Sequence, residues 1–289
     1  MKAGSEARKS PATTVEFRGH RGIRLVGDAY GDPADRPVVL LHGGGQTRHA
    51  WGGTAAALAT HGWYAIALDM RGHGDSDWAD DGDYTTDTLA ADLRCVIAAL
   101  GTRAAVVGAS LGGITALLAE GEAETSISRA LVLVDIAPRV EADGVHRIVT
   151  FMTGRPEGFA SLEEAADAVA SYNAHRPRPS DVSGLRKNLR LGSDGRYRWH
   201  WDPALMSDKR PGATQNPERQ EAASRRLTVP TLLVRGRMSD LLSEDGARAF
   251  LALVPHARYA DVSGAGHMVA GDRNDAYTRA VVEFLADVP

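Results

Sequence analysis

Residues 104–113 read Ala-Ala-Val-Val-Gly-Ala-Ser-Leu-Gly-Gly, and this stretch decides the fold. Four apolar residues, typical of a buried strand, lead directly into Gly-x-Ser-x-Gly and then into a helical pattern over 111–119. Glycines beside the serine let the chain turn sharply, which leaves the hydroxyl exposed while the free N–H groups of the helix start face a developing oxyanion. Ser110 is therefore the candidate nucleophile; the alternative is an N-cap serine in a glycine-rich turn.

Similar apolar runs recur along the chain, and helical patterns separate them. The predicted strands are 38–41, 64–68, 104–107, 130–134, 231–234 and a weaker 259–262, preceded by a hairpin of 15–18 and 22–28. The predicted helices between and after them are 54–60, 86–100, 111–119, 245–253 and 276–286. Continuous Val, Leu and Ile runs are typical of strands covered on both faces. The alternation predicts an α/β fold with a mostly parallel, doubly wound sheet.

The alternation breaks between residues 138 and 226. This stretch has a helical pattern at 162–174 and an aromatic cluster, Tyr197-Arg-Trp-His-Trp201, and it is too long for a plain loop. We expect a helical cap over the carboxyl edge of the sheet, inserted after the sixth strand. The predicted domains are a core of 14–137 and 227–289, a cap of 138–226 and a flexible N-terminus of 1–13.

Composition limits the classes of function. The 289 residues carry 33 Lys and Arg against 37 Asp and Glu, a net charge of −4, so no basic excess favours nucleic acid as a partner. The single cysteine, Cys95, excludes an internal disulfide and thiolate metal clusters. The apolar runs are shorter than the ~20 residues that span a bilayer. The first residues lack the apolar core of a secretory signal, so we expect a cytoplasmic protein.

A serine hydroxyl needs a general base, and a carboxylate must hold that base in the right tautomer. His267 lies in a glycine-rich loop after the last predicted strand, from which an imidazole can reach across the sheet edge. Two carboxylates end neighbouring segments: Asp240 follows the strand at 231–234, and Asp135 ends the strand at 130–134. The chain order Ser110, Asp240, His267 favours Asp240, and Asp135 remains the alternative acid. Glu244 is a weaker candidate, because it is expected to open the following helix.

The oxyanion hole requires two backbone donors. One is the N–H of Leu111, the residue after the nucleophile, and the other is expected at Gly44, with Gly43 as the alternative, in the loop His42-Gly-Gly-Gly45. This loop lacks the patterns of a nucleotide-phosphate site, so no nucleotide is expected. His42 is expected to order the loop rather than to react. The chemistry needs no metal and no organic cofactor.

Residues near the predicted site are candidates for substrate contact. Gln46, His49 and Met268 flank it, and His200 is a candidate to face the substrate from the cap. The cap also offers an apolar and aromatic surface formed by Phe151, Met152, Phe159, Tyr172, Trp199 and Trp201. The expected partner is a small molecule with an apolar or aromatic group. The oligomeric state is left open.

Taken together, these stretches resemble the α/β-hydrolase fold family, in its capped, esterase- and lactonase-like serine hydrolase subclass. The matching stretches are His42-Gly-Gly-Gly45, Asp69-Met-Arg-Gly-His-Gly-Asp-Ser76, Gly108-Ala-Ser-Leu-Gly-Gly113, 236–240 and Gly264-Ala-Gly-His267. The resemblance implies an eight-stranded sheet and a Ser–Asp–His triad. Many relatives place the acid three residues after the glycine that ends the strand, but that position is Ser239 here, which keeps Asp135 open.

The function expected from these residues is hydrolysis of a carboxylic ester, lactone or thioester through an acyl-enzyme on Ser110. Relatives with the same triad cleave carbon–carbon bonds or perform cofactor-free oxygenation or perhydrolysis, and these reactions are the main alternative. A ligand receptor on the same scaffold is a third interpretation. A serine at position 110 disfavours the relatives that use an aspartate nucleophile.

Overall fold

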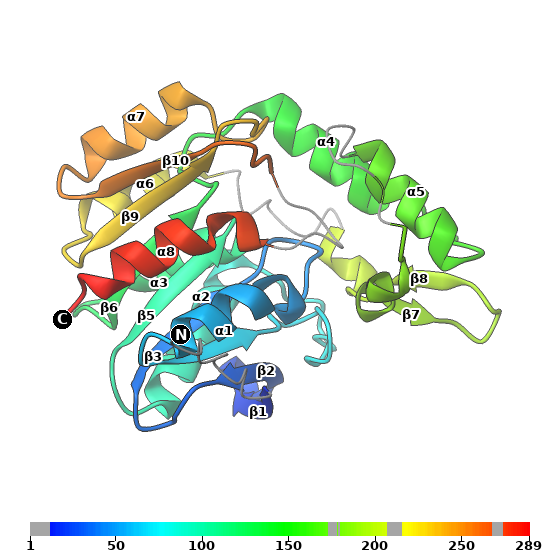
Figure 1. The fold of residues 1–289 in the computed structure, drawn as a ribbon, viewed down its shortest axis with the longest axis horizontal. Coiled ribbons are helices and arrows are strands. Elements are labelled where there is room, and N and C mark those ends of the chain that lie inside the picture. Colours follow the sequence, from blue (N-terminus) through cyan, green and yellow to red (C-terminus); the bar gives the residue numbers. More distant parts are fainter. Residues whose placement is uncertain (1–11, 173–177, 179, 207–215, 268–273) are drawn as a thin grey trace, which may run out of the picture.

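The computed structural model describes residues 12–172, 178, 180–206, 216–267 and 274–289. Its centre is an eight-stranded sheet in the order β1-β2-β4-β3-β5-β6-β9-β10 (Figure 1). The strands are β1 (Thr13–Arg18), β2 (Arg24–Tyr30), β3 (Arg36–Leu41), β4 (Trp63–Leu68), β5 (Ala104–Ala109), β6 (Ser128–Val134), β9 (Thr231–Gly236) and β10 (Arg258–Val262). The β1–β2 and β2–β4 pairs are antiparallel, and all the others are parallel. The predicted α/β fold is confirmed.

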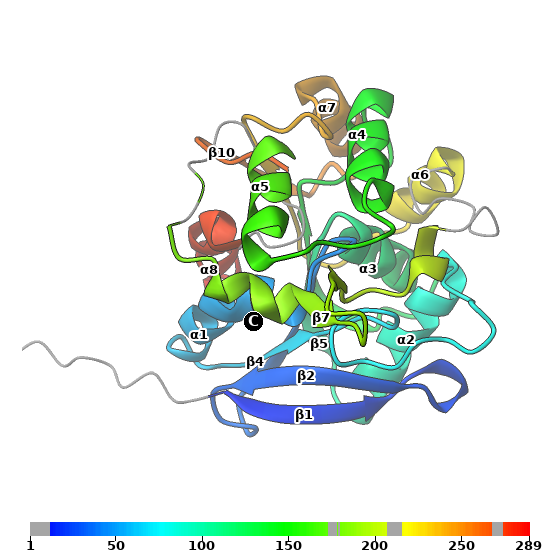
Figure 2. The same cartoon turned by 90° about the vertical axis from the view of Figure 1, so that its right-hand side faces the viewer.

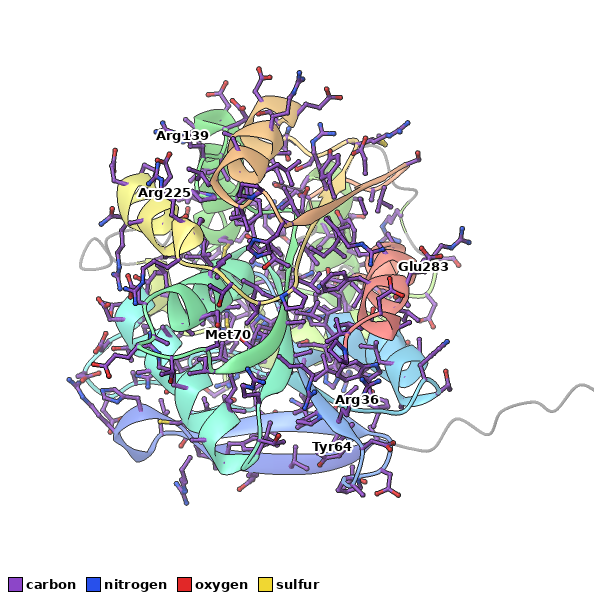
Figure 3. All side chains as sticks on the ribbon, turned by 90° about the vertical axis from the view of Figure 1, so that its left-hand side faces the viewer. Arg36, Tyr64, Met70, Arg139, Arg225 and Glu283 are labelled. Atoms are coloured by element: carbon purple, nitrogen blue, oxygen red, sulfur yellow. The ribbon has the colours of Figure 1, made fainter. Side chains whose placement is uncertain are left out.

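Helices cover both faces of the sheet, because alternate side chains of each buried strand point to opposite faces. Helices α1 (Gly52–Ala59) and α8 (Thr278–Ala286) pack on the face that receives Val38 and Leu40. Helices α2 (Thr86–Ala99), α3 (Leu111–Gly121), α6 (Pro217–Arg225) and α7 (Glu244–Leu253) pack on the opposite face, with Val39 and Leu41. In Figure 3 the labelled Met70 lies inside these layers, whereas Arg225 and Glu283 lie at their outer surface.

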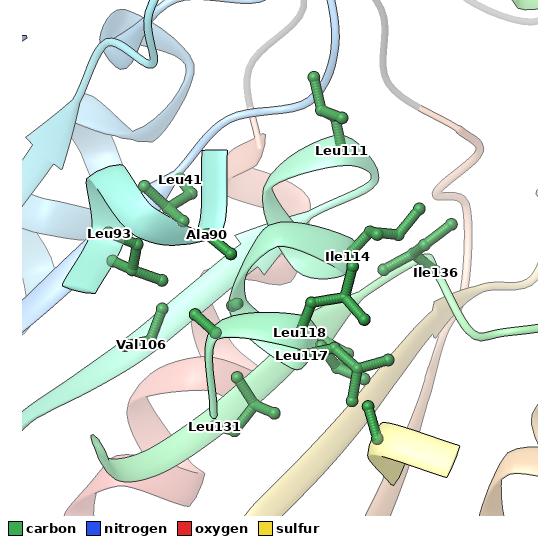
Figure 4. Packing of buried hydrophobic residues seen from close by; sticks show 14 of the residues in the cluster. Leu41, Ala90, Leu93, Val106, Leu111, Ile114, Leu117, Leu118, Leu131 and Ile136 are labelled. Atoms are coloured by element: carbon green, nitrogen blue, oxygen red, sulfur yellow. The ribbon is translucent and has the colours of Figure 1, made fainter. Parts of the chain in front are cut away.

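Helix α3, which follows the candidate nucleophile, is buried along its whole length. Its residues Ile114, Leu117 and Leu118 pack with Leu131 and Ile136 in one apolar cluster (Figure 4). A helix that is apolar all round needs neighbours on every side, and here the sheet, α2 and α6 supply them. The nucleophile therefore starts a helix that is firmly held in the core.

Between β6 and β9 the chain leaves the sheet. We call residues 138–226 the inserted segment; it contains α4 (Ala142–Thr153), α5 (Leu162–Tyr172), a separate two-stranded sheet of β7 (Leu189–Leu191) and β8 (Tyr197–Trp199), and α6. Figures 1 and 2 show α4, α5 and β7 on one side of the main sheet. This part has a small apolar core of its own, which includes Phe159, Ala165 and Trp199.

Helix α6 differs from the rest of the inserted segment. It lies within the range predicted for the cap, yet it packs against α3 and α7. The contact with α3 is close, because a Cβ atom on Gly121 would lie only 2.4 Å from the carbonyl oxygen of Ala223. This helix therefore lies with the layer that covers the main sheet. In the described ranges the short 3-10 helices are His20–Gly22, Arg48–Trp51, Ser183–Asn188, Pro203–Met206 and Asn274–Tyr277.

The sequence patterns missed α4, α6 and the β7–β8 pair. The start of α6 carries a signal that could have been used: the Asn216 side chain accepts a hydrogen bond from the Arg219 N–H, and Pro217 occupies the first helical turn. In α4 the residues Val145, Ile148, Val149 and Met152 form an apolar stripe at helical spacing, which is a second unused signal, whereas β7 and β8 are only three residues each. Among the described helices, none combines the length and apolarity that crossing a bilayer requires.

Candidate active site

Ser110 sits at the turn between β5 and α3 with φ 47° and ψ −115°. A non-glycine residue rarely adopts a positive φ, so this backbone is strained. The turn is fixed on both sides: the Ser110 N–H donates to the Val134 carbonyl of β6 at 3.2 Å, and its own carbonyl accepts from the Ile114 N–H at 3.0 Å. The predicted strand–turn–helix context of the serine is present.

The glycines of the Gly-x-Ser-x-Gly stretch are needed for close packing. A Cβ atom on Gly108 would lie 2.4 Å from the Gly112 carbonyl oxygen, and one on Gly112 would lie 2.6 Å from the Leu41 carbonyl oxygen. Side chains at these positions would push α3 away from β5 and β3. The glycines therefore let the nucleophile turn sit directly against the end of β3, where the glycine loop begins.

Asp135 repeats the geometry of Ser110 one strand further along. It follows the end of β6 with φ 53°, and its N–H donates to the Val234 carbonyl of β9 at 2.7 Å. Within the described residues, only Ser110, Asp135 and Arg21 combine a side chain with a positive φ. Strained residues persist where the surroundings fix them, and they cluster at functional sites. Two of the three lie side by side at the carboxyl edge of the sheet.

The Asp135 carboxylate is the hydrogen-bond partner of His267. His267 Nδ1 lies 2.9 Å from Asp135 Oδ2, and both side chains are about 4% exposed. The same carboxylate accepts from the Ser239 hydroxyl at 2.7 Å and from the Gly236 N–H at 3.1 Å. Because Asp135 holds Nδ1, the other imidazole nitrogen, Nε2, is available as a base.

Asp240, the acid favoured by the chain order, occupies a different place. Its Oδ2 pairs with Arg147 Nη1 of α4 at 2.7 Å, and about a third of the side chain is exposed. No hydrogen bond joins it to His267 in the described part of the chain. The carboxylate that His267 contacts is thus Asp135, the alternative acid, and not Asp240, the preferred one. The physical reason is that Ser239, three residues after the strand-end glycine, donates to Asp135 instead of supplying a carboxylate itself.

The loop His42-Gly-Gly-Gly45 lies against the nucleophile. A Cβ atom on Gly43 would be 3.4 Å from the Ser110 Cβ. The Gly43 N–H donates to Gln46 Oε1 at 3.0 Å, and the Gly45 N–H donates to His73 Nε2 at 3.2 Å. The Gly44 N–H, in contrast, has no acceptor among the described residues. It is thus the one amide of the three glycines that can still bind an external oxygen.

Gln46 and His49, which the sequence predicts to contact substrate, interact with other parts of the protein in the structure. Gln46 is 1% exposed and braces the glycine loop, with a second hydrogen bond from its Nε2 to Asn274 Oδ1 at 3.3 Å. His49 lies 3.6 Å from Asp28 and lines a surface cavity of about 190 Å³ together with basic side chains, among them Arg186 and Arg190. Burial is the main cause that lowers the pKa of His49, and the charge of Arg48 adds to it.

Two side chains of the inserted segment contact the glycine loop. They are Trp201 and Met152, which lie 3.1 Å and 3.0 Å from the position of a Cβ on Gly45. Trp199 stacks on Trp201 with 5.1 Å between ring centroids, and the Phe151 ring lies 5.6 Å from that of Trp199. Met268 lies outside the described residues.

Three buried histidines were not predicted to act together. His42, His73 and His200 are 0%, 0% and 2% exposed, and their rings lie in a row with centroid separations of 4.8 Å and 5.8 Å. Burial lowers the pKa of His42, and it lowers the pKa of His200 to about 3. In the sequence, His42 and His73 each lie beside glycines and His200 lies among aromatic residues. These local features do not reveal that the three rings are close together in the fold.

Comparisons with known proteins agree with this geometry. A family model described as the alpha/beta hydrolase fold matches residues 36–273. Esterase Rv0045c of Mycobacterium tuberculosis is 31% identical over 267 residues, which cover 90% of this chain and 84% of that protein. Its crystal structure superposes with a TM-score of 0.70 at 27% identity, covering 96% of this chain and 91% of the other.

Two further proteins extend the comparison. The 3-hydroxybutyrate-oligomer hydrolase of Cupriavidus necator is 29% identical over 258 residues, 84% of this chain and 87% of that protein. An alpha/beta hydrolase from Novosphingobium aromaticivorans superposes with a TM-score of 0.76 at 26% identity, covering 96% and 98% of the two chains. The relatives with named activities support ester hydrolysis as the general reaction.

Proposed function

The chain belongs to the alpha/beta hydrolase fold family, and we propose that within it the protein is a serine hydrolase with Ser110 as nucleophile, His267 as base and Asp135 as the acid. The observation that carries this proposal is the hydrogen bond between His267 Nδ1 and Asp135 Oδ2 at 2.9 Å, next to the strained turn at Ser110. The Ser110 amide is bound to the residue just before Asp135, so the nucleophile and the acid end adjacent strands.

In the first half of the reaction, His267 Nε2 takes the proton of the Ser110 hydroxyl as Oγ attacks the substrate carbonyl carbon. Asp135 keeps the proton on Nδ1 and stabilises the imidazolium that forms. The negative oxygen of the tetrahedral intermediate accepts hydrogen bonds from the N–H groups of Gly44 and Leu111, the second of which is a free amide at the start of α3.

Collapse of the intermediate breaks the bond to the leaving group, which receives the proton from His267 Nε2 and departs as an alcohol or thiol. The acyl group remains on Ser110 Oγ. His267 then removes a proton from water, the water oxygen attacks the acyl carbonyl, and Ser110 leaves with the proton restored. The reaction releases a carboxylic acid and needs no cofactor.

The substrate class that fits best is a carboxylic ester, lactone or thioester with an apolar or aromatic group. The support is chemical: Met152 and Trp201 lie against the glycine loop beside Gly44, and the Trp199 ring continues this apolar surface. Such side chains favour burial of apolar surface rather than of charge. The named activities of the esterase relatives agree with this class.

The test uses p-nitrophenyl acetate and butyrate with purified wild-type protein, the Ser110→Ala variant and protein treated with a fluorophosphonate. We expect hydrolysis by the wild type, its loss in Ser110→Ala, and one phosphonyl adduct on Ser110 by intact-mass analysis and peptide mapping. Unchanged hydrolysis by Ser110→Ala, or an adduct on a different residue, would refute the assignment of the nucleophile.

A further inference from the structure

The peptide groups of the glycine loop are held by three imidazoles rather than by backbone pairing alone. His42 Nδ1 bonds the Gly43 carbonyl at 2.8 Å, and His73 Nε2 accepts from the Gly45 N–H at 3.2 Å. The third contact comes from outside the main sheet: His200 Nε2 lies 3.2 Å from the Gly45 carbonyl oxygen. Together these contacts fix the peptides on both sides of Gly44.

The bonding pattern defines the role of each nitrogen of His200. The Gly74 N–H donates to His200 Nδ1 at 2.6 Å, so Nδ1 is an acceptor. The proton of the neutral ring then sits on Nε2, which donates it to the Gly45 carbonyl. His200 therefore links two loops of the core, the glycine loop and the turn at Gly74, through one neutral ring.

His200 itself belongs to the inserted segment, directly after β8. Its N–H donates to the Asn188 carbonyl at 3.1 Å, and two residues later the Asp202 N–H donates to the Gly72 carbonyl at 2.9 Å. The adjacent Trp201 ring packs on Gly45, which has a φ of 77°. The inserted segment thus contacts the glycine loop through a hydrogen bond and a ring in consecutive residues.

We propose that His200 is a positioning residue for the oxyanion hole, through which the inserted segment fixes the loop that carries the Gly44 N–H. This inference rests on the proposed serine hydrolase function. The hydrogen bond from His200 to the Gly45 carbonyl restrains the Gly45–Gln46 peptide. His42 restrains the Gly43–Gly44 peptide, which carries the Gly44 N–H, and His73 restrains the Gly44–Gly45 peptide between them. A donor held in place before the reaction stabilises the oxyanion more than one that must be ordered during it.

The His200 ring makes two hydrogen bonds, one to the Gly45 carbonyl and one from the Gly74 N–H, and different substitutions remove each of them. In His200→Gln the amide nitrogen lies near the place of Nε2 and can still donate to the Gly45 carbonyl. In His200→Asn the amide oxygen lies near the place of Nδ1 and can still accept from Gly74, but the shorter side chain does not reach Gly45. The exposed His61, replaced by Gln, is the control for a histidine substitution far from the loop.

The experiment measures kcat and KM for p-nitrophenyl butyrate, inhibition by a trifluoromethyl ketone that forms an oxyanion adduct, and the thermal midpoint of each variant. We expect His200→Asn to lose about tenfold or more in kcat with KM within about twofold, and to bind the ketone correspondingly more weakly. His200→Gln should recover most of both losses, and His61→Gln should match the wild type.

Equal kcat and equal ketone affinity in His200→Asn and the wild type would overturn the proposal. So would equal losses in both His200 variants that follow only their thermal midpoints, since this would indicate a purely structural contact. Fluorophosphonate labelling of Ser110 in the wild type is measured in parallel. Absence of that adduct would refute the proposed function itself, whereas its presence with unaffected His200 variants would refute only the role of His200.

Discussion

His267 Nδ1 lies 2.9 Å from Asp135 Oδ2, so the histidine of the glycine-rich loop after β10 is bound to the carboxylate that ends β6. The two residues are 132 positions apart in the chain. The strands β6 and β9 are neighbours in the sheet, and the Gly236 N–H at the end of β9 also donates to the Asp135 carboxylate at the end of β6. The Asp135 carboxylate thus has three hydrogen-bond partners: the His267 imidazole, the Ser239 hydroxyl and the Gly236 amide.

The first prediction separates the two candidate acids. Asp135→Asn should lower kcat for p-nitrophenyl butyrate by about 10³- to 10⁴-fold, because an amide cannot hold the imidazole in the required tautomer. Asp240→Asn should leave kcat within about twofold, because it removes a partly exposed ion pair with Arg147. Steady-state kinetics of the two variants decide; the reverse order of effects would restore Asp240 as the acid.

A second prediction concerns the close packing of the nucleophile turn. Gly112→Ala should lower the free energy of unfolding by about 1–3 kcal/mol, because its Cβ would meet the Leu41 carbonyl oxygen at 2.6 Å. Gly184→Ala is the matched control: nothing lies within 4 Å of its Cβ position, so a change within about 0.5 kcal/mol is expected. Urea unfolding measures both, and equal stabilities of the two variants would contradict the packing argument.

The strained backbone at Ser110 gives a third prediction. Ser110→Gly should be more stable than Ser110→Ala by about 1 kcal/mol, because glycine accepts φ 47° without strain whereas alanine does not. Both variants should lack esterase activity. Denaturant unfolding of the pair provides the comparison, and a less stable glycine variant would show that the turn carries little strain.

A fourth prediction follows from the buried His200. Burial, with smaller contributions from His42 and Arg190, lowers its pKa to about 3 from 6.5, although Asp75 and the Gly45 carbonyl act in the opposite direction. Below about pH 6.5 the unfolded chain binds a proton that the folded chain excludes, so the free energy of unfolding falls as the pH drops towards 3.

Replacement of His200 by Gln removes this proton. The slope of unfolding free energy against pH between about 4 and 6 should become shallower by about 1.4 kcal/mol per pH unit, while the remaining slope reflects groups such as His42. Urea titrations of both proteins across this range test it. Superimposable slopes would mean that His200 is protonated in the fold.

Much of the fold could be predicted because the apolar runs of buried parallel strands are strong local signals. The strand before Ser110 and the helix after it were predicted from one continuous stretch, 104–119, and the structure has β5 and α3 there. The inserted segment was harder. Its helix α4 carries apolar residues at helical spacing, Val145, Ile148, Val149 and Met152, so the signal was present and was overlooked beside the stronger patterns of the sheet.

The hydrogen-bond partner of His267 could not be identified from the sequence for a different reason. Asp135 and Asp240 both follow strands that end at the same sheet edge, and sequence spacing does not reveal which carboxylate faces the imidazole. The contact of Asp240 with Arg147 depends on α4, which was not predicted. The row of His42, His73 and His200 was missed because it joins three segments that only the folded chain brings together.

The measurement that tests the central claim most directly is a rapid-quench reaction in the pre-steady state, with p-nitrophenyl acetate in excess over the enzyme. The account predicts a burst of p-nitrophenol close to one per active site, and an acetyl group on Ser110 by peptide mapping of the quenched protein. Hydrolysis with no acetylated Ser110, or with the acetyl group on another residue, would contradict it.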